Sequence, residues 1–174
     1  MIEQHHIAGL VVECRKLDSE WGGHAWRPVT VFPVPPEVAP WTPLGSSAAG
    51  RRYYAGPVGI AFYSTDTANY IDNLNSGEPR LWVVMRAEGP EPPLDIVCVT
   101  ADPAEGEGNS ESGSNIVETV AMPPEIAAAL AEFVVAHHVE RPIIKRKRDR
   151  AEPELKWRPG EGPQAKPGHG EGRE

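Results

Sequence analysis

Apolar residues recur along this chain with two different periods, and together they predict an α+β domain. Six runs rich in β-branched and aliphatic residues are bounded by Gly, Pro and Asp, which is typical of strands. From their order we expect a mainly antiparallel sheet of about five to six strands, with two helices and a disordered C-terminal tail. The predicted strands are residues 7–17, 27–34, 51–64, 81–86, 94–101 and 116–122.

Two further segments repeat their apolar residues every three to four positions, which predicts helices. The first helix begins at Asp66 and is capped by Ser64 or Thr65. The second begins at Pro124, since proline is favoured in a first helical turn, and ends near His138. The apolar positions of the first are Ala68, Ile71 and Leu74, and the second places Ile126, Leu130, Phe133, Val134 and His137 on one face.

The segments between these elements predict loops, and the end of the chain predicts a tail. Residues 33–50 form a proline-rich loop, and residues 102–114 form an acidic, mobile loop rich in Gly and Ser. Residues 143–174 carry Pro, Gly and charge but few apolar side chains, so burial cannot offset the cost of ordering them. We therefore expect a domain over residues 1–142, followed by a basic, disordered tail.

Charge is unevenly distributed along the 174 residues, which have a net charge of −8. Up to Glu140 there are 7 Lys and Arg against 19 Asp and Glu, and from Arg141 onward there are 10 against 6. An acidic body repels phosphate backbones, so a nucleic acid is not the expected partner. The simplest interpretation of the basic run KRKRDR is a solvated tail, and the next is docking to an acidic protein partner. Nucleic-acid binding and a nuclear signal are the remaining alternatives. The candidate partner-binding residues of this run are Lys145, Arg146, Lys147 and Arg148.

Motifs for catalysis, metal binding or cofactor binding are not recognisable in the sequence. Four of the six histidines occur as two adjacent pairs, whose members do not share a helix face, and no HExxH or phosphate-binding glycine loop is present. Cys14 and Cys98 lie within apolar runs and are predicted to be buried structural thiols, with a disulfide between them left open. We expect no cofactor and no metal, and we favour a protein without catalytic activity.

The stretch WGGHAW concentrates aromatic residues around a glycine turn. Trp21 and Trp26 offer large apolar surfaces, and His24 could hydrogen-bond to the backbone and hold the turn. The favoured interpretation is structural, with the rings folded over an edge of the sheet. The alternative is a platform for a protein partner, because exposed aromatic residues also mark interfaces.

Hydropathy and the N-terminal residues both predict a cytoplasmic protein. No segment approaches the roughly 20 apolar residues that span a bilayer. The first residues, MIEQHHIAGLVVECRKL, are too charged for a secretory signal peptide. No membrane span is therefore expected.

Several motifs occur in a fixed order: W-x-x-H-x-W-x-P, R-x-Y-x-G, T-x-x-Y-x-x-N-L and a final HHV-E-x-P before KRKR. In these motifs the chain resembles, over about residues 10–150, a bacterial family of unknown function. Genes of that family often lie beside those for molybdenum-dependent formate dehydrogenases and their accessory proteins. The resemblance implies an accessory or interaction protein for assembly or regulation of such a molybdoenzyme.

Two alternatives to an accessory role remain open. Some members of the resembled family are labelled molybdopterin-guanine dinucleotide biosynthesis protein A, which implies an enzyme or cofactor-binding step in molybdenum cofactor maturation. Such a nucleotidyltransferase needs a glycine-rich loop after its first strand to hold phosphate, whereas this chain has DSEWGGHAW there. The other alternative is a nucleic-acid-binding regulator that uses the basic tail.

Overall fold

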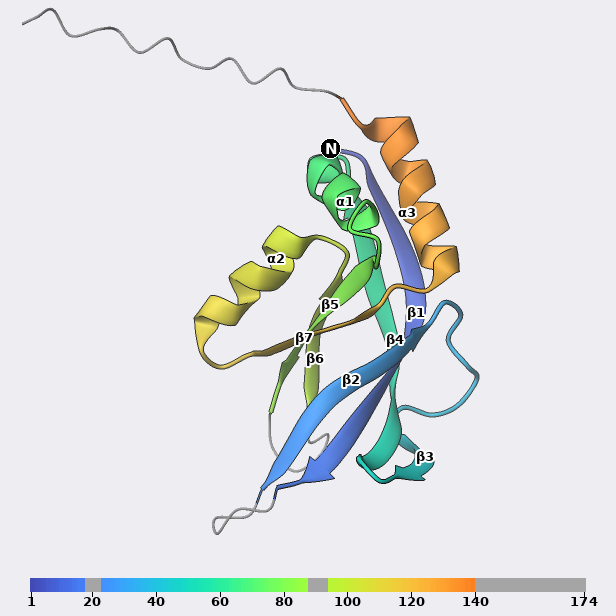
Figure 1. The fold of residues 1–174 in the computed structure, drawn as a ribbon. Coiled ribbons are helices and arrows are strands. Elements are labelled where there is room, and N and C mark those ends of the chain that lie inside the picture. The colour runs from blue at the N-terminus through green and yellow to red at the C-terminus, as the bar shows by residue number, and fades with distance from the viewer. Residues whose placement is uncertain (18–22, 88–93, 140–174) are drawn as a thin grey trace, which may run out of the picture. The chain divides into compact units, whose positions relative to one another are not determined.

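The structure is a computed structural model that describes residues 1–17, 23–87 and 94–139, all within one unit, Met1–Glu140. In these ranges the chain forms seven strands and three α-helices, and every strand pairing is antiparallel (Figure 1). The predicted α+β class is therefore confirmed. The strands form two sheets, whereas a single sheet was expected.

The first sheet has the order β2-β1-β4-β3 and is built on two long strands. β1 (Glu3–Lys16) lies between β2 (His24–Phe32) and β4 (Gly50–Tyr63), and β3 (Thr42–Ser47) pairs only with the first residues of β4. The register of β1 shifts by a bulge against each neighbour, near Val11. Bulges increase the local twist of a sheet, and both long strands pass through this point.

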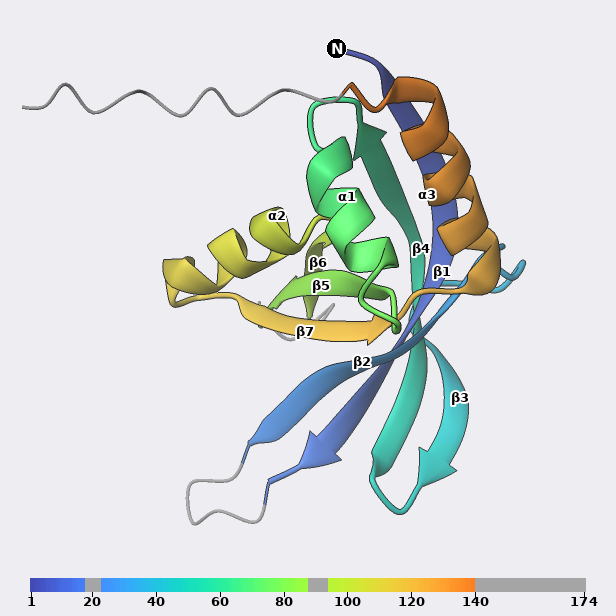
Figure 2. The same ribbon diagram turned by 45° about the horizontal axis from the view of Figure 1, so that its top comes forward.

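The second sheet packs across the first and encloses the core. Its order is β6-β5-β7, from β5 (Arg80–Arg86), β6 (Asp95–Thr100) and β7 (Ile116–Ala121). β2 lies next to β7, and β4 lies next to β6, so the sheets meet along both edges (Figure 2). Alternate side chains of each central strand face the other sheet and are fully buried: Ala8, Leu10 and Val12 on β1, and Leu81, Val83 and Met85 on β5.

Two helices cover one end of this core. α1 (Thr67–Leu74) packs against α3 (Pro124–His137). The predicted apolar face of α3 is confirmed, because Ile126, Leu130, Phe133 and Val134 are buried. His137, at the end of that face, lies edge-on to the Phe133 ring at 4.7 Å between ring centroids. None of the helices within the described residues has the length and apolar composition needed to cross a membrane.

The predicted cap of the first helix is wrong. The Asp66 residue holds the N-cap position, and α1 begins at Thr67 without a side-chain cap. Ser64 has another partner: its hydroxyl accepts the Ile2 amide at 3.0 Å, and its own amide donates to the Ile2 carbonyl at 2.9 Å. The serine therefore fixes the beginning of β1 beside the end of β4.

Both predicted loops contain regular structure. The loop expected at 33–50 includes β3, and the loop expected at 102–114 contains α2 (Pro103–Gly108) and a short 3-10 helix, η1 (Asn109–Ser112). The Asp102 carboxylate caps α2 by accepting the Ala104 amide at 2.8 Å, and it also accepts the Asn69 amide group at 2.9 Å. These contacts tie α2 to the end of β6 and to α1. The tail predicted to be disordered lies outside the described residues.

Candidate functional site

One end of the first sheet extends as a four-stranded arm, which we define as residues 12–16, 24–28, 42–47 and 50–54. It is the end at which both hairpins turn, in the lower part of Figures 1 and 2. On the core-facing side of β1, exposure increases along the strand. Val12 is fully buried, Cys14 is half-buried and Lys16 is exposed. The core-facing side of the sheet therefore becomes solvent-accessible within the arm.

The arm carries most of the positive charge of the described residues. Five of their seven Lys and Arg lie in it, together with a single carboxylate, that of Glu13. The other described residues have two positive side chains against 13 carboxylates. The arm is thus a cationic site on an otherwise acidic unit. Its positive residues are Arg15, Lys16, Arg27, Arg51 and Arg52.

Register divides these charges between the two faces of the arm. Glu13 lies opposite Arg27 on β2 and Arg52 on β4, so the three side chains share one face. Cys14, the next residue, points to the other face and lies opposite Arg51 on β4. We call the first the ion-pair face and the second the pocket face.

On the ion-pair face, a buried carboxylate is fully occupied by hydrogen bonds. Glu13 is 1% exposed, and its Oε1 accepts Arg27 Nε at 2.9 Å and Arg27 Nη2 at 2.6 Å. Its Oε2 accepts Arg52 Nε and the Ser47 hydroxyl, both at 3.2 Å. Burial by itself raises the pKa of Glu13, but these hydrogen bonds outweigh burial and lower its pKa below the ordinary value. This cluster links β1, β2 and β4 to one another and to Ser47 at the end of β3.

The pocket face contains a cavity of about 440 Å³. Lys16 on β1 and His24 on β2 lie opposite each other at its outer end, and Arg51 lies on the other neighbouring strand, β4, opposite Cys14. Among the residues described, no ion pair joins Lys16 or Arg51 to a carboxylate. Neither cation is therefore neutralised by a carboxylate of the described residues. The lining residues are Cys14, Lys16, His24, Ser46, Ser47, Gly50, Arg51 and Tyr53.

Gly50 allows the two hairpins to approach each other beneath this cavity. Its φ is +156°, and a Cβ at this position would meet the Cys14 carbonyl oxygen and the Glu13 side chain. Any larger residue would push the turn between β3 and β4 away from β1. The glycine therefore determines the spacing of both faces of the arm.

The Cys14 thiol lies in the pocket wall but is not activated as a nucleophile. Burial raises its pKa, so the thiol is protonated at neutral pH. Burial also raises the pKa of Cys98 to about 11, with a smaller contribution from Glu105. Both cysteines are free, and they are half-buried where buried thiols were expected from their apolar runs.

The WGGHAW residues are divided between the pocket and a neighbouring aromatic cluster. His24 is exposed and lines the cavity, whereas Trp26 is half-buried and packs against Trp41 and Tyr53, with ring centroids 6.0 and 5.8 Å away. Trp41 reaches this position from a backbone with φ of +66°, which is uncommon for a residue with a side chain. Trp21, and the candidates Lys145, Arg146, Lys147 and Arg148, lie outside the described residues.

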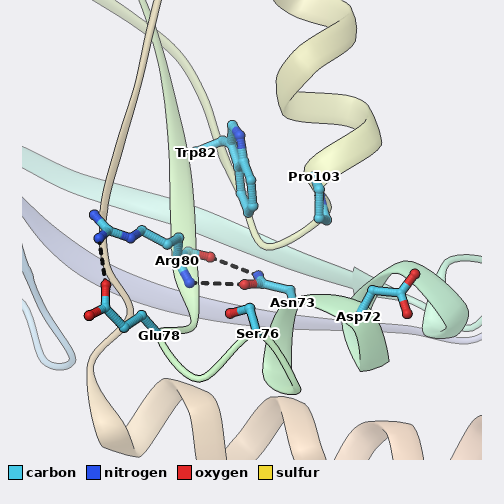
Figure 3. Close-up of a pocket in the computed structure, with 7 residues that line it drawn as sticks. All are labelled: Asp72, Asn73, Ser76, Glu78, Arg80, Trp82 and Pro103. Carbon is cyan, nitrogen blue, oxygen red and sulfur yellow. Dashed lines mark hydrogen bonds and ion pairs between the residues drawn. The ribbon is translucent and has the colours of Figure 1, made fainter.

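A second cavity, also of about 440 Å³, lies between α1, β5 and α2 (Figure 3). Its central polar residue, Asn73, is engaged in the fold: its Nδ2 donates to the carbonyls of Arg80 and Ala101, and its Oδ1 accepts the Arg80 amide. Arg80 in turn pairs with Glu78 at 2.9 Å. These polar groups are already satisfied by one another, so the arm remains the better candidate site.

Within the described ranges, no group of three or more His, Cys, Asp or Glu side chains is arranged to hold a metal ion. The fold and the site thus define a small α+β protein with a cationic sheet arm. The chain belongs to the family "Protein of unknown function (DUF3305)", whose model matches residues 8–148. The expected membership of a family of unknown function is thereby confirmed, but the match says nothing of formate dehydrogenase. No match was found among the curated proteins or among the solved structures.

Most charged residues of the site were missed in the sequence, among them Glu13, Lys16, Arg51 and Arg52. The available signal was the occurrence of charged residues at the ends of two predicted strands, in ECRK and RRYY. Charge at a strand end is usually solvated, so the pattern alone does not distinguish a site from a surface. Only the register brings Glu13 between two arginines and separates Arg51 from Arg52.

Proposed function

We propose that this protein is a cytoplasmic, non-catalytic accessory protein that binds an acidic surface of a protein partner through its arm. The observation that carries this proposal is the segregation of charge, with five positive side chains on the arm and 13 carboxylates on the remaining described residues. Opposite charges steer the encounter of two proteins and orient them. Such a distribution favours one docking orientation, because the acidic remainder repels the same partner.

The chemistry of the arm favours binding over catalysis. Lys16 and Arg51 supply positive charge and hydrogen-bond donors, but the neighbouring Cys14 thiol is protonated at neutral pH. The Glu13 carboxylate is held by two arginines and a serine, which leaves it poorly suited to accept a proton. A donor-rich surface whose thiol is protonated and whose carboxylate is already occupied suits recognition.

The proposed partner is a molybdoenzyme of the formate dehydrogenase type or one of its accessory proteins. Support for this partner comes from the resemblance in the ordered motifs, among them W-x-x-H-x-W-x-P, whose histidine is His24 and whose second tryptophan is Trp26. His24 lies in the cavity of the arm, so this motif contributes to the surface that we propose for docking.

Affinity purification of the tagged full-length chain tests the proposal. We expect subunits of the oxidoreductase to co-purify with the wild type and to be strongly depleted with the double variant Lys16→Ser/Arg51→Ser. Arg80→Ser is the matched control, because it removes one positive charge outside the arm and should retain the partner. Absence of oxidoreductase subunits from the wild-type eluate, or equal recovery with the double variant, contradicts the proposal.

The basic tail requires a separate variant, in which Lys145, Arg146, Lys147 and Arg148 are all replaced by serine. If the arm is the docking surface, this variant retains the partner at equilibrium and only associates more slowly, because steering charge has been removed. Complete loss of the partner in the tail variant, with full retention in the arm variant, would assign docking to the tail instead.

A further inference from the structure

We infer that the cavity on the pocket face binds the phosphate group of a phosphate monoester. This site rests on the proposed function, in which the arm is a recognition surface. It adds the chemical group that the arm recognises. Lys16 and Arg51 border the cavity from adjacent strands, without a carboxylate partner among the described residues. A tetrahedral oxyanion would be the counter-charge for both.

The donors around the cavity suit a phosphate better than a single carboxylate. Arginine presents a planar fork that can bind two oxygens at once, and lysine is a compact charge with three donors. The Ser46 side chain adds a hydroxyl from β3, opposite Arg51, and His24 adds an imidazole from β2. Donors thus come from all four strands, and they surround one cavity as a tetrahedral anion requires.

The nearby carboxylate does not cancel this positive charge. Glu13 lies on the opposite face and is held there by Arg27 and Arg52, so the ion-pair cluster carries a net positive charge. The Ser47 hydroxyl donates to Glu13 Oε2 at 3.2 Å and so contributes to the ion-pair face, although Ser47 as a residue also borders the cavity. An anion bound at Lys16 and Arg51 would therefore face an arm that is positive on both sides of the sheet.

The size of the cavity and its aromatic wall favour an ester over free phosphate. A volume of about 440 Å³ is within the range of roughly 300–1,000 Å³ that is typical of small-molecule sites and far exceeds one phosphate ion. Tyr53 forms part of the wall on the inner side, towards Val12, which lies opposite it on β1. The charged groups thus lie at the outer end, and an apolar surface for the esterified group lies behind them.

A titration of the pure full-length chain tests this inference without any partner. Inorganic phosphate, O-phosphoserine, adenosine monophosphate and acetate are each added at constant ionic strength, and backbone amide shifts are followed by NMR. We expect saturable shifts at Ser47, Gly50 and Arg51, with the monoesters bound more tightly than inorganic phosphate and acetate bound weakest. Equal affinity for acetate, or no saturable shift at these residues, overturns the inference.

Variants distinguish binding in the cavity from general attraction of an anion to the other positive charges of the chain. Lys16→Ser/Arg51→Ser should weaken monoester binding at least tenfold, whereas Arg80→Ser and the quadruple serine variant of the tail should leave it within twofold. A double variant that binds as the wild type does would overturn the inference. Because no partner is present, failure of the titration together with co-purification of the oxidoreductase would reject the phosphate site and leave the accessory role standing.

Discussion

The two faces of the arm both carry arginine, but the arginines of the two faces have different roles. On the ion-pair face, Arg27 and Arg52 bind the two oxygens of one buried carboxylate. On the pocket face, Arg51, which directly precedes Arg52 in β4, has no carboxylate partner among the described residues. The comparison teaches that neighbouring arginines of one strand can serve stability and recognition separately, because alternate side chains point to opposite faces.

The difference is energetic as well as geometric. Removing one member of a buried ion pair leaves a charge with unsatisfied hydrogen bonds, which is costly. Removing an exposed and unpaired charge costs little stability, since water already solvates it. Variants of the two faces should therefore differ most in the property that they damage: the free energy of unfolding for the ion-pair face and anion binding for the pocket face.

The largest effect on stability is expected from Gly50→Ala, which should disturb both faces of the arm because it displaces the turn between β3 and β4. The added Cβ would collide with the Cys14 carbonyl oxygen, so β4 must move away from β1 and the turn beside Glu13 must shift. We expect a loss of about 3 kcal/mol in the free energy of unfolding, the upper end for overpacking of a rigid contact. Chemical denaturation measures it. Gly59→Ala is the control, because a Cβ there meets nothing within 4 Å, and equal losses in both variants would contradict the steric argument.

The next effect, on the ion-pair face alone, is expected from Glu13→Gln. Glutamine preserves the shape but removes the charge that binds Arg27 and Arg52, and its amide group cannot accept hydrogen bonds as the second oxygen does. We expect a loss of about 2 kcal/mol, because the arginines are half-exposed and water can partly replace the carboxylate. Glu78→Gln, in an exposed pair on the second sheet, should change stability by less than about 0.5 kcal/mol. A Glu13 variant as stable as this control would show that the cluster does not stabilise the fold.

A smaller effect on the same face should appear as a pH dependence. Because the pKa of Glu13 is lower in the folded chain than its ordinary value of 4.5, the folded state favours the ionised form. The stabilisation is fully present above pH 4.5 and is lost as the pH falls through the folded-state pKa. The stability difference between wild type and Glu13→Gln should therefore be constant from neutral pH down to about 5 and shrink below 4.5. Urea denaturation across this range measures it, and a difference that grows on acidification would mean that folding raises the pKa of Glu13.

The long strands and α3 could be predicted from the sequence because their signals are local. β1 and β5 each contain a continuous run of mainly apolar residues, IAGLVV and LWVVM, and the face of α3 follows a helical period. β3 escaped prediction because TPLGSS has low β propensity and becomes a strand only by pairing with β4. The division into two sheets was not predictable either, since it depends on contacts between residues far apart in the chain.

The candidate site was only partly predictable for a related reason. The WGGHAW motif pointed to His24 and Trp26, which lie in or beside the cavity, because aromatic residues around glycines are an unusual local pattern. Lys16 and Arg51 are 35 positions apart and become neighbours only through the antiparallel pairing of β1 with β4. The site therefore depends on the register between strands that are far apart in the sequence, and it cannot be predicted from local composition.

The smallest effect on stability is expected from Lys16→Ser/Arg51→Ser, and this variant sharpens the comparison most. Both side chains are exposed and lack ion pairs among the described residues, so the free energy of unfolding should change by less than about 0.5 kcal/mol. Thermal and urea denaturation should overlay the wild-type curves, while anion binding to the pocket face falls. If the free energy of unfolding fell by as much as in Glu13→Gln, Lys16 and Arg51 would also stabilise the arm. The assignment of stability to the ion-pair face and of anion binding to the pocket face would then be wrong.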